Sequence, residues 1–150
     1  MEKNIVIKET TDYYPLSILF HDNGVGVPVR KDTPEGMVKM WRMEKAETGE
    51  LIAAVTLQIR AGVHALGSIA VDPNYRSLGY GTVMQETLFA EAKKLGVKEV
   101  WACAKVPDYY FKNGWEKMPW DTSPKVDVNC PTCDKLGKTC NPTIIRKIID

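Results

Sequence analysis

The sequence of 150 residues predicts an α+β fold: a mixed, mainly antiparallel sheet of six to seven strands, flanked by helices. Two observations predict it. Segments 37–44 and 51–60 are strand-like and flank a polar turn, as in an antiparallel hairpin. A strand over 63–71 is followed by a helical pattern that ends at Gly96 and by an apolar run over 97–105, which is the order of a strand–helix–strand crossover.

The elements before the hairpin are a strand, a helix and a loop. Residues 5–7 predict a short strand, and residues 12–20 predict a helix that Pro15 interrupts. Residues 22–36 are rich in glycine and proline, which predicts a long loop.

The hairpin and the crossover helix show clear periodicity. Apolar and polar residues alternate in the strand over 51–60, which predicts one buried face. That face consists of Val55, Leu57 and Ile59. The crossover helix has an apolar stripe at helical spacing. The stripe consists of Met84, Thr87, Leu88, Ala92 and Leu95.

The C-terminal third contains a short helix over 109–113, ended by Gly114, and a strand that starts at Trp115. Segment 143–149 is ambiguous from its residues alone. Its four isoleucines fit helical spacing, whereas its β-branched content favours a strand.

Composition narrows the class of protein. A net charge of +1 gives no reason to expect a nucleic acid or an anionic membrane as partner. No apolar run approaches the ~20 residues of a transmembrane helix, and the apolar core of residues 1–8 is too short for a signal peptide. We therefore expect a single domain over 1–150 in the cytoplasm, where the four cysteines stay reduced.

The segment from Arg76 to Gly81 lies between the strand over 63–71 and the crossover helix. The start of a helix presents several N–H groups without partners, and these groups bind anions. Gly79 and Gly81 let the backbone approach an anion closely, and Arg76 adds a positive charge. The segment therefore predicts a site for the phosphate or pyrophosphate of a nucleotide-like cofactor.

Two common phosphate motifs do not fit this segment. A P-loop requires Gly-Lys followed by Ser or Thr, but Gly81 is followed by Thr82 and Val83. A dinucleotide fingerprint requires a third glycine where Met84 stands, and an acid at the far end of the next strand, whereas Glu99 stands near its beginning.

Residues 69–81 resemble the acyl-CoA signature of the GNAT superfamily of N-acyltransferases, Arg/Gln-x-x-Gly-x-Gly/Ala after a strand that ends near Val-x-Pro. Residues 109–115, Tyr-Tyr-Phe-Lys-Asn-Gly-Trp, resemble the second signature of that family, aromatic-Tyr-x-x-x-Gly-aromatic. The two signatures in this order are specific together. The resemblance implies that 143–149 is the last strand and that 119–141 is a cysteine-containing insertion before it.

The resemblance also implies an activity: transfer of an acetyl group from acetyl-CoA to an amine of a small molecule or a protein, by direct attack on the thioester. It implies that the Val71 N–H faces the thioester carbonyl and that Tyr110 is catalytic and donates to the departing thiolate. A phenol of pKa ~10 would pass its proton to a thiolate whose thiol has pKa ~8.5 at a cost of about 2 kcal/mol. The implied cofactor-binding residues are Ile69, Val71, Arg76, Ser77, Leu78, Gly79, Tyr80, Gly81 and Thr82.

A general base is not evident in the sequence. Members of the family often carry Glu or His on the strand before the glycine turn, but the inward positions here are Ala65 and Gly67. His64 has the opposite parity and needs a strand bulge to point inward. Glu44 and His21 are further candidates, and no base is assigned.

Cys130 and Cys133 have the spacing of a zinc knuckle, and Cys140 follows them. A structural zinc site needs four ligands, so zinc, a redox pair of thiols and plain thiols in a loop all stay open and no metal ligand is assigned.

Two further alternatives also stay open: Tyr110 as an ordinary core residue, and the whole chain as a non-catalytic acyl-CoA-binding or thiol- or metal-sensing module. The edge strands offer a surface for a homodimer.

Overall fold

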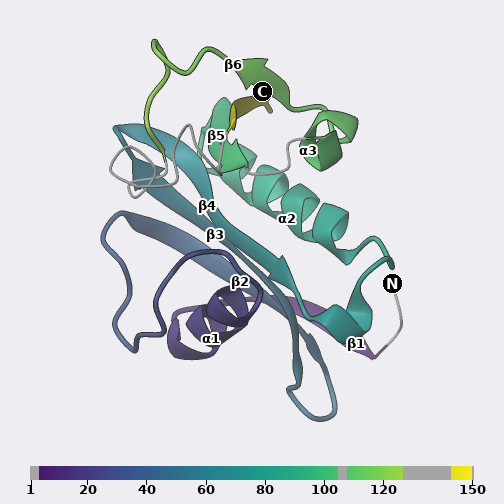
Figure 1. The fold of residues 1–150 in the computed structure, drawn as a ribbon. Coiled ribbons are helices and arrows are strands. Elements are labelled where there is room, and N and C mark those ends of the chain that lie inside the picture. The colour runs from purple at the N-terminus through teal and green to yellow at the C-terminus, as the bar shows by residue number, and fades with distance from the viewer. Residues whose placement is uncertain (1–3, 105–107, 127–142, 150) are drawn as a thin grey trace.

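The computed structural model describes residues 4–104, 108–126 and 143–149 (Figure 1). The strands are β1 (Ile5–Thr10), β2 (Met37–Lys45), β3 (Leu51–Arg60), β4 (Val63–Val71), β5 (Glu99–Ala104), β6 (Glu116–Met118) and β7 (Thr143–Ile148). The helices are α1 (Tyr14–Asp22), α2 (Tyr80–Lys94) and α3 (Asp108–Lys112), with a short 3-10 helix, η1 (Pro73–Tyr75), before α2.

The strands form one sheet in the order β1-β2-β3-β4-β5-β7-β6. Each neighbouring pair is antiparallel except β4 and β5, which the α2 crossover joins in parallel. The predicted α+β class, with a mixed and mainly antiparallel sheet, is therefore confirmed. The ambiguous segment at the C-terminus forms β7 between β5 and β6, so its β-branched content outweighs its helical spacing.

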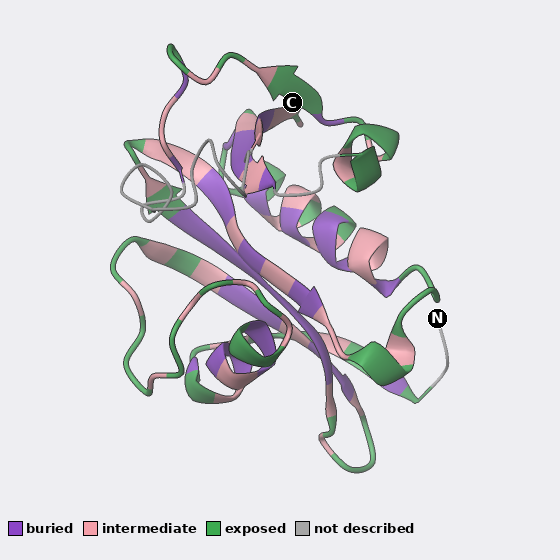
Figure 2. Cartoon of the chain, in the orientation of Figure 1, coloured by how far each residue is buried: buried purple, intermediate pink, exposed green. Residues whose placement is uncertain are grey.

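Helices cover both faces of the sheet (Figure 1). On one face, Met84 and Leu88 of α2 pack in a core cluster with Val55 of β3. On the other face, Leu16 and Phe20 of α1 pack with residues of β2, β3 and β4. Buried residues consequently form an unbroken run in β3, the strand that lies between the two helices (Figure 2).

The prediction of a single buried face for β3 is wrong. Because α1 and α2 lie on opposite sides of the strand, residues 52–58 are all buried, including the polar Thr56 and Gln58. Ile59, predicted to belong to the buried face, is exposed near the end of the strand.

Pro15 does not interrupt the first helix, because it stands in the first turn of α1, where a proline lacks no hydrogen bond. The predicted end of α2 is confirmed at Gly96, whose φ is +83°. The Val97 N–H donates to the Ala92 carbonyl at 3.0 Å, so residue 97 still closes the helix and β5 begins only at Glu99.

The buried residues of α2 are Tyr80, Met84, Gln85, Leu88 and Ala92, so Thr87 and Leu95 of the predicted stripe are not buried. Leu95 is exposed because it stands at the C-cap of the helix. Gln85 is buried instead, and its Oε1 accepts a hydrogen bond of 2.8 Å from Nε1 of Trp115. A buried glutamine breaks an apolar stripe, so this contact is not visible in the hydrophobic pattern.

Strand β4 contains a bulge at Gly67, because Leu57 and Thr56 of β3 pair with Leu66 and Ser68. The bulge reverses the alternation of side chains along the strand. Leu66 therefore packs with Ile69 on the α2 side, and Ala65 packs on the opposite side. The assignment of Ala65 as an inward position assumed strict alternation along the strand, and the bulge breaks this alternation.

In the parallel pairing of β4 with β5, Ala65 lies opposite Trp101, near the beginnings of both strands. The carboxyl half of β4, Ile69 to Val71, pairs with β3 on one edge. Its other edge, on the side of β5, is left without a registered strand partner in the described chain.

Within the same part of the chain, none of the helices is long and apolar enough to cross a membrane.

Candidate functional site

A pocket of about 440 Å³ lies where the carboxyl end of β4 meets the first turn of α2. It is lined by Ile69, Ala70, Val71, Tyr75, Arg76, Ser77, Gly79, Tyr80, Gly81, Thr82 and Tyr109. Every residue predicted from the sequence to bind the cofactor lies in this lining except Leu78, whose side chain is exposed. The structure therefore brings the predicted residues together around one cavity.

The loop before α2 has an unusual backbone. Ser77 and Gly79 both have positive φ, +66° and +81°, and Gly79 is the N-cap of the helix. The first intrahelical bond runs from the Val83 N–H to the Gly79 carbonyl. The N–H groups of residues 80–82 therefore precede the helical ladder and lie at its positive end, beside the pocket.

Arg76 lines the pocket, but its guanidinium already has protein partners. Nε donates to the Val71 carbonyl at 3.3 Å, and Nη2 donates to Oδ1 of Asn23. Asn23 is the C-cap of α1, on the opposite face of the sheet. The arginine thus links α1 to the loop that forms the pocket, and a bound phosphate would compete with these two acceptors.

The open edge of β4 offers main-chain donors to the pocket. The Asp72 N–H donates to the Ile52 carbonyl of β3 at 2.8 Å. Because N–H groups alternate between the two edges of a strand, the N–H groups of Ile69 and Val71 point to the edge on the β5 side. This is the edge that borders the pocket.

Tyr110 and Tyr109 differ in their surroundings. Tyr110 packs against the main core cluster, with its ring centroid 5.9 Å from that of Trp115. Burial, with a smaller contribution from Tyr109, raises the pKa of Tyr110 to about 12. Tyr110 does not appear in the pocket lining, whereas the adjacent Tyr109 does, with its hydroxyl 3.0 Å from Oγ1 of Thr82.

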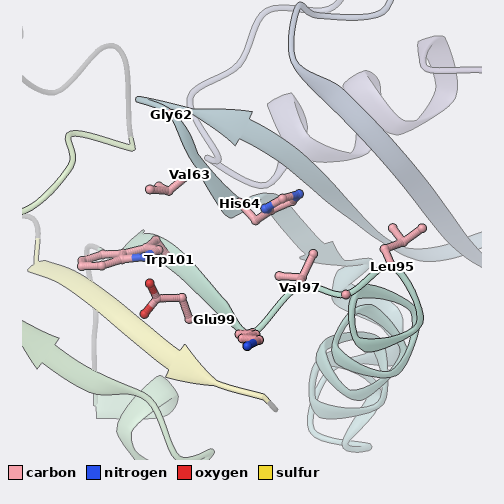
Figure 3. A pocket seen from close by; sticks show the side chains of 9 residues that line it. Gly62, Val63, His64, Leu95, Val97, Glu99 and Trp101 are labelled. Atoms are coloured by element: carbon pink, nitrogen blue, oxygen red, sulfur yellow. The ribbon is translucent and has the colours of Figure 1, made fainter.

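His64 lies outside the pocket. It lines a second hollow, of about 280 Å³, with Leu95, Val97, Glu99 and Trp101 (Figure 3). This hollow is built from the beginnings of β4 and β5, whereas the first pocket borders the end of β4. The bulge that the sequence argument required is present, but it does not bring His64 into the first pocket.

The two other base candidates also lie elsewhere. Glu44 is buried in β2 and forms ion pairs with Lys8 at 2.9 Å and Arg42 at 3.1 Å, so two cations already neutralise it. His21 stands in the last turn of α1, exposed, with Nδ1 3.3 Å from Oδ1 of Asp22. Neither of them contributes to the described lining of the pocket.

The predicted cysteine cluster, Cys130, Cys133 and Cys140, lies outside the described residues. Cys103 of β5 packs near Trp101 and Trp120, on the face of the sheet opposite α2. No group of three or more metal-ligating side chains occurs within the described ranges.

Three lining residues were not expected from the sequence: Ala70, Tyr75 and Tyr109. Tyr75 stands in η1, and its hydroxyl donates to Oε2 of Glu50 at 2.9 Å. The signal for Tyr109 was present, because it is the first residue of the second signature, but two adjacent tyrosines cannot be ranked by sequence spacing alone.

Comparison with known proteins identifies the family of the chain. The profile of the acetyltransferase (GNAT) family matches residues 8–113, most of the chain and all of the first pocket. Among solved structures, N-acetylglutamate synthase from Neisseria gonorrhoeae, complexed with coenzyme A and N-acetyl-glutamate, superposes with a TM-score of 0.70 at 16% identity. The match covers 100% of this chain but 36% of that enzyme, so this chain spans about a third of its length.

Two smaller proteins match over almost their whole length. The ribosomal-protein-S18-alanine N-acetyltransferase from Escherichia coli has a TM-score of 0.66 at 17% identity, over 97% of this chain and 94% of that chain. A GNAT family acetyltransferase from Elizabethkingia anophelis, with acetyl-CoA bound, has a TM-score of 0.62 at 14% identity, over 98% and 99%. These likenesses show the fold, and the profile match over residues 8–113 shows that the chain belongs to the GNAT family of acetyltransferases.

Proposed function

We propose that the protein is an N-acetyltransferase that transfers the acetyl group of acetyl-CoA to an amine of a small molecule or a protein, by direct attack on the thioester. One observation carries the proposal: a single pocket combines the N-terminus of α2 with the open edge of β4. The first feature suits a pyrophosphate and the second suits a chain of amides, and coenzyme A contains both.

The N–H groups of residues 80–82 are proposed to bind the pyrophosphate, supported by the helix dipole. Gly79 and Gly81 carry no side chain of their own that would block the approach to these donors. Arg76 contributes charge once it exchanges Asn23 for a phosphate oxygen.

The Val71 N–H is proposed to polarise the thioester carbonyl. As the amine attacks, the carbonyl oxygen becomes an oxyanion, and a fixed donor at this point is worth about 3 kcal/mol in comparable sites. The tetrahedral intermediate then collapses, the carbon–sulfur bond breaks, and coenzyme A departs as a thiolate.

Tyr110 is proposed to donate a hydrogen bond to that thiolate. With a pKa of about 12, the phenol is a weaker acid than an ordinary tyrosine. Full transfer of its proton to a thiolate whose thiol has pKa ~8.5 would cost about 5 kcal/mol, so the role is hydrogen bonding without complete transfer.

The attacking amine must lose a proton, because an amine of pKa ~10 is mostly charged at neutral pH. The described lining of the pocket contains no aspartate, glutamate or histidine. We therefore propose that water molecules in the pocket carry this proton to the solvent.

Calorimetry with coenzyme A and an assay of free thiol with a panel of amines test the proposal together. We expect binding with a Kd in the micromolar range and release of coenzyme A in the presence of at least one amine. Absence of any affinity for coenzyme A would contradict the whole proposal.

Among its described lining residues the pocket has no acid or imidazole, which favours one other function, a non-catalytic acyl-CoA-binding module. In the same experiment, tight binding of acetyl-CoA without turnover on any amine would support this second function.

A further inference from the structure

The hydroxyl of Tyr109 lies over the first turn of α2, inside the acyl-CoA pocket. It is 3.0 Å from Oγ1 of Thr82. A Cβ atom built on Gly81 would be 2.8 Å from the same hydroxyl, so the phenol rests directly against that glycine. The side chain is 42% exposed and faces the cavity that a cofactor would fill.

A short chain of hydrogen bonds determines which way the Tyr109 hydroxyl points. Nδ2 of Asn113 donates to the Tyr109 main-chain carbonyl at 2.9 Å, which turns Oδ1 of the amide towards Thr82. Oγ1 of Thr82 donates its only proton to that Oδ1 at 3.3 Å. Towards Tyr109, the threonine oxygen is therefore an acceptor, and the phenol is the donor.

The phenol oxygen of Tyr109 consequently keeps its lone pairs for a ligand. Since its proton is engaged by Thr82, the hydroxyl presents an acceptor to the pocket. Phosphate oxygens carry no proton to donate at neutral pH, whereas the pantetheine arm of coenzyme A carries two amide N–H groups. The acceptor therefore fits the arm and not the phosphates.

We propose that Tyr109 is a cofactor-binding residue whose phenol oxygen accepts a hydrogen bond from an amide N–H of the pantetheine arm. The inference rests on the proposed function, because it assumes that acyl-CoA occupies this pocket. It gives Tyr109 a role separate from that of Tyr110, which is partly buried and packs against Trp115.

The test compares Tyr109→Phe with the wild-type protein, using two probes in calorimetry. One probe is coenzyme A, and the other is its nucleotide half, which keeps the phosphates and lacks the pantetheine arm. We expect Tyr109→Phe to lower the affinity for coenzyme A about tenfold, as for loss of one hydrogen bond. The affinity for the nucleotide half should stay within twofold of the wild-type value. Tyr14→Phe is a matched control, because Tyr14 is 40% exposed and lies on α1, away from the pocket.

Other results of this calorimetry would contradict either the inference or the proposed function. Equal weakening of both probes would place the phenol on a phosphate and overturn the inference, as would unchanged affinity for both. If wild-type protein fails to bind coenzyme A, the proposed function itself fails.

A second pair of variants keeps the inference testable if Tyr109→Phe folds poorly. Thr82→Ser retains the hydroxyl that holds the Tyr109 proton, and Thr82→Val removes it. We expect Thr82→Ser to bind coenzyme A as the wild type does, and Thr82→Val to bind it several-fold more weakly with an unchanged melting temperature. Equal affinity of the two variants would overturn the inferred orientation of the phenol.

Discussion

Two adjacent tyrosines in α3 have different environments and, in our proposal, different tasks. Tyr110 packs against Trp115 with a raised pKa, whereas the hydroxyl of Tyr109 contacts Thr82 at the pocket wall. A single hydroxyl removed from either one leaves the ring and its packing in place, so the pair can be compared with little structural disturbance.

Tyr110→Phe should lower kcat ten- to hundredfold, because the departing thiolate loses a hydrogen-bond donor. Affinity for coenzyme A should stay within twofold, because the proposed hydrogen bond strengthens only as the sulfur departs as a thiolate. Steady-state kinetics with acetyl-CoA, with Tyr109→Phe measured in parallel, provide the check. An unchanged kcat would remove Tyr110 from the mechanism and leave it as a core residue.

Tyr110 should also make the protein less stable at alkaline pH. Its pKa is raised to about 12 in the folded protein, so folding favours the neutral phenol. The contribution is fully present below pH ~10 and is lost as the pH rises towards ~12, by about 2–3 kcal/mol. Urea unfolding should therefore show a steeper loss of stability over this range in the wild type than in Tyr110→Phe. Parallel curves for the two proteins would contradict the burial of the phenol.

At the scale of single elements, the first turn of α2 joins the pocket to α3. Gly81 stands in that turn, against the Tyr109 hydroxyl, and Gly79 stands at the N-cap with positive φ. The two glycines are therefore needed for different reasons: Gly81 for space and Gly79 for backbone conformation.

Gly81→Ala should keep the fold and weaken binding of coenzyme A. The new methyl group would displace the exposed end of Tyr109, while alanine favours the helix by up to about 1 kcal/mol. The melting temperature should stay constant or rise slightly, and calorimetry should show a several-fold higher Kd. Gly79→Ala is the control, because no atom lies within 4 Å of its Cβ position and its cost is backbone strain, about 1–2 kcal/mol of stability. A loss of stability in Gly81→Ala as large as that in Gly79→Ala would contradict this distinction.

Most helices and strands could be predicted from short sequence patterns. Where the structure departs from the predicted elements, the bulge in β4 is one cause. The hairpin strands, β4 and the end of α2 were predictable, because alternation and Gly96 are strong short-range signals. The bulge at Gly67 was not, since a glycine in a strand can mark either a bulge or a close contact. Here it marks both, because a Cβ at Gly67 would clash with Oε1 of Gln58.

The residues of the candidate site could be predicted from the sequence, but the contacts that these residues make could not. The two signatures indicated the loop over 76–82 and the helix over 109–113. They did not reveal that Arg76 donates to Asn23, a residue of the opposite face, or that Tyr109 faces the cavity. Both facts depend on contacts between segments far apart in the chain, which a local pattern does not encode.

At the scale of the whole molecule, the cofactor is expected to act as a structural component. The pocket is bounded by β4, η1, α2 and α3, so a bound ligand contacts four elements of the native fold at once. Ligand binding to the native state alone stabilises it by about 2.7 kcal/mol at a concentration of 100 times Kd.

Coenzyme A at that concentration should raise the melting temperature by about 5–10 °C for a domain of this size. A thermal scan at fixed protein concentration, with the nucleotide half of coenzyme A as comparison, measures the shift. A shift below 1 °C at saturating ligand would show that the ligand also binds the unfolded chain or does not bind at all.

In the part of the chain that the structure describes, the carboxyl half of β4 has no registered partner on the β5 side, and this has a consequence for handling the purified protein. A strand that lacks a neighbour is a template on which another polypeptide can form a β-ladder. Here the gap beside Ile69 to Val71 would be filled by the pantetheine amides in place of a peptide. Ligand-free preparations should therefore self-associate more readily during storage, and adding coenzyme A at the first purification step should keep them monodisperse.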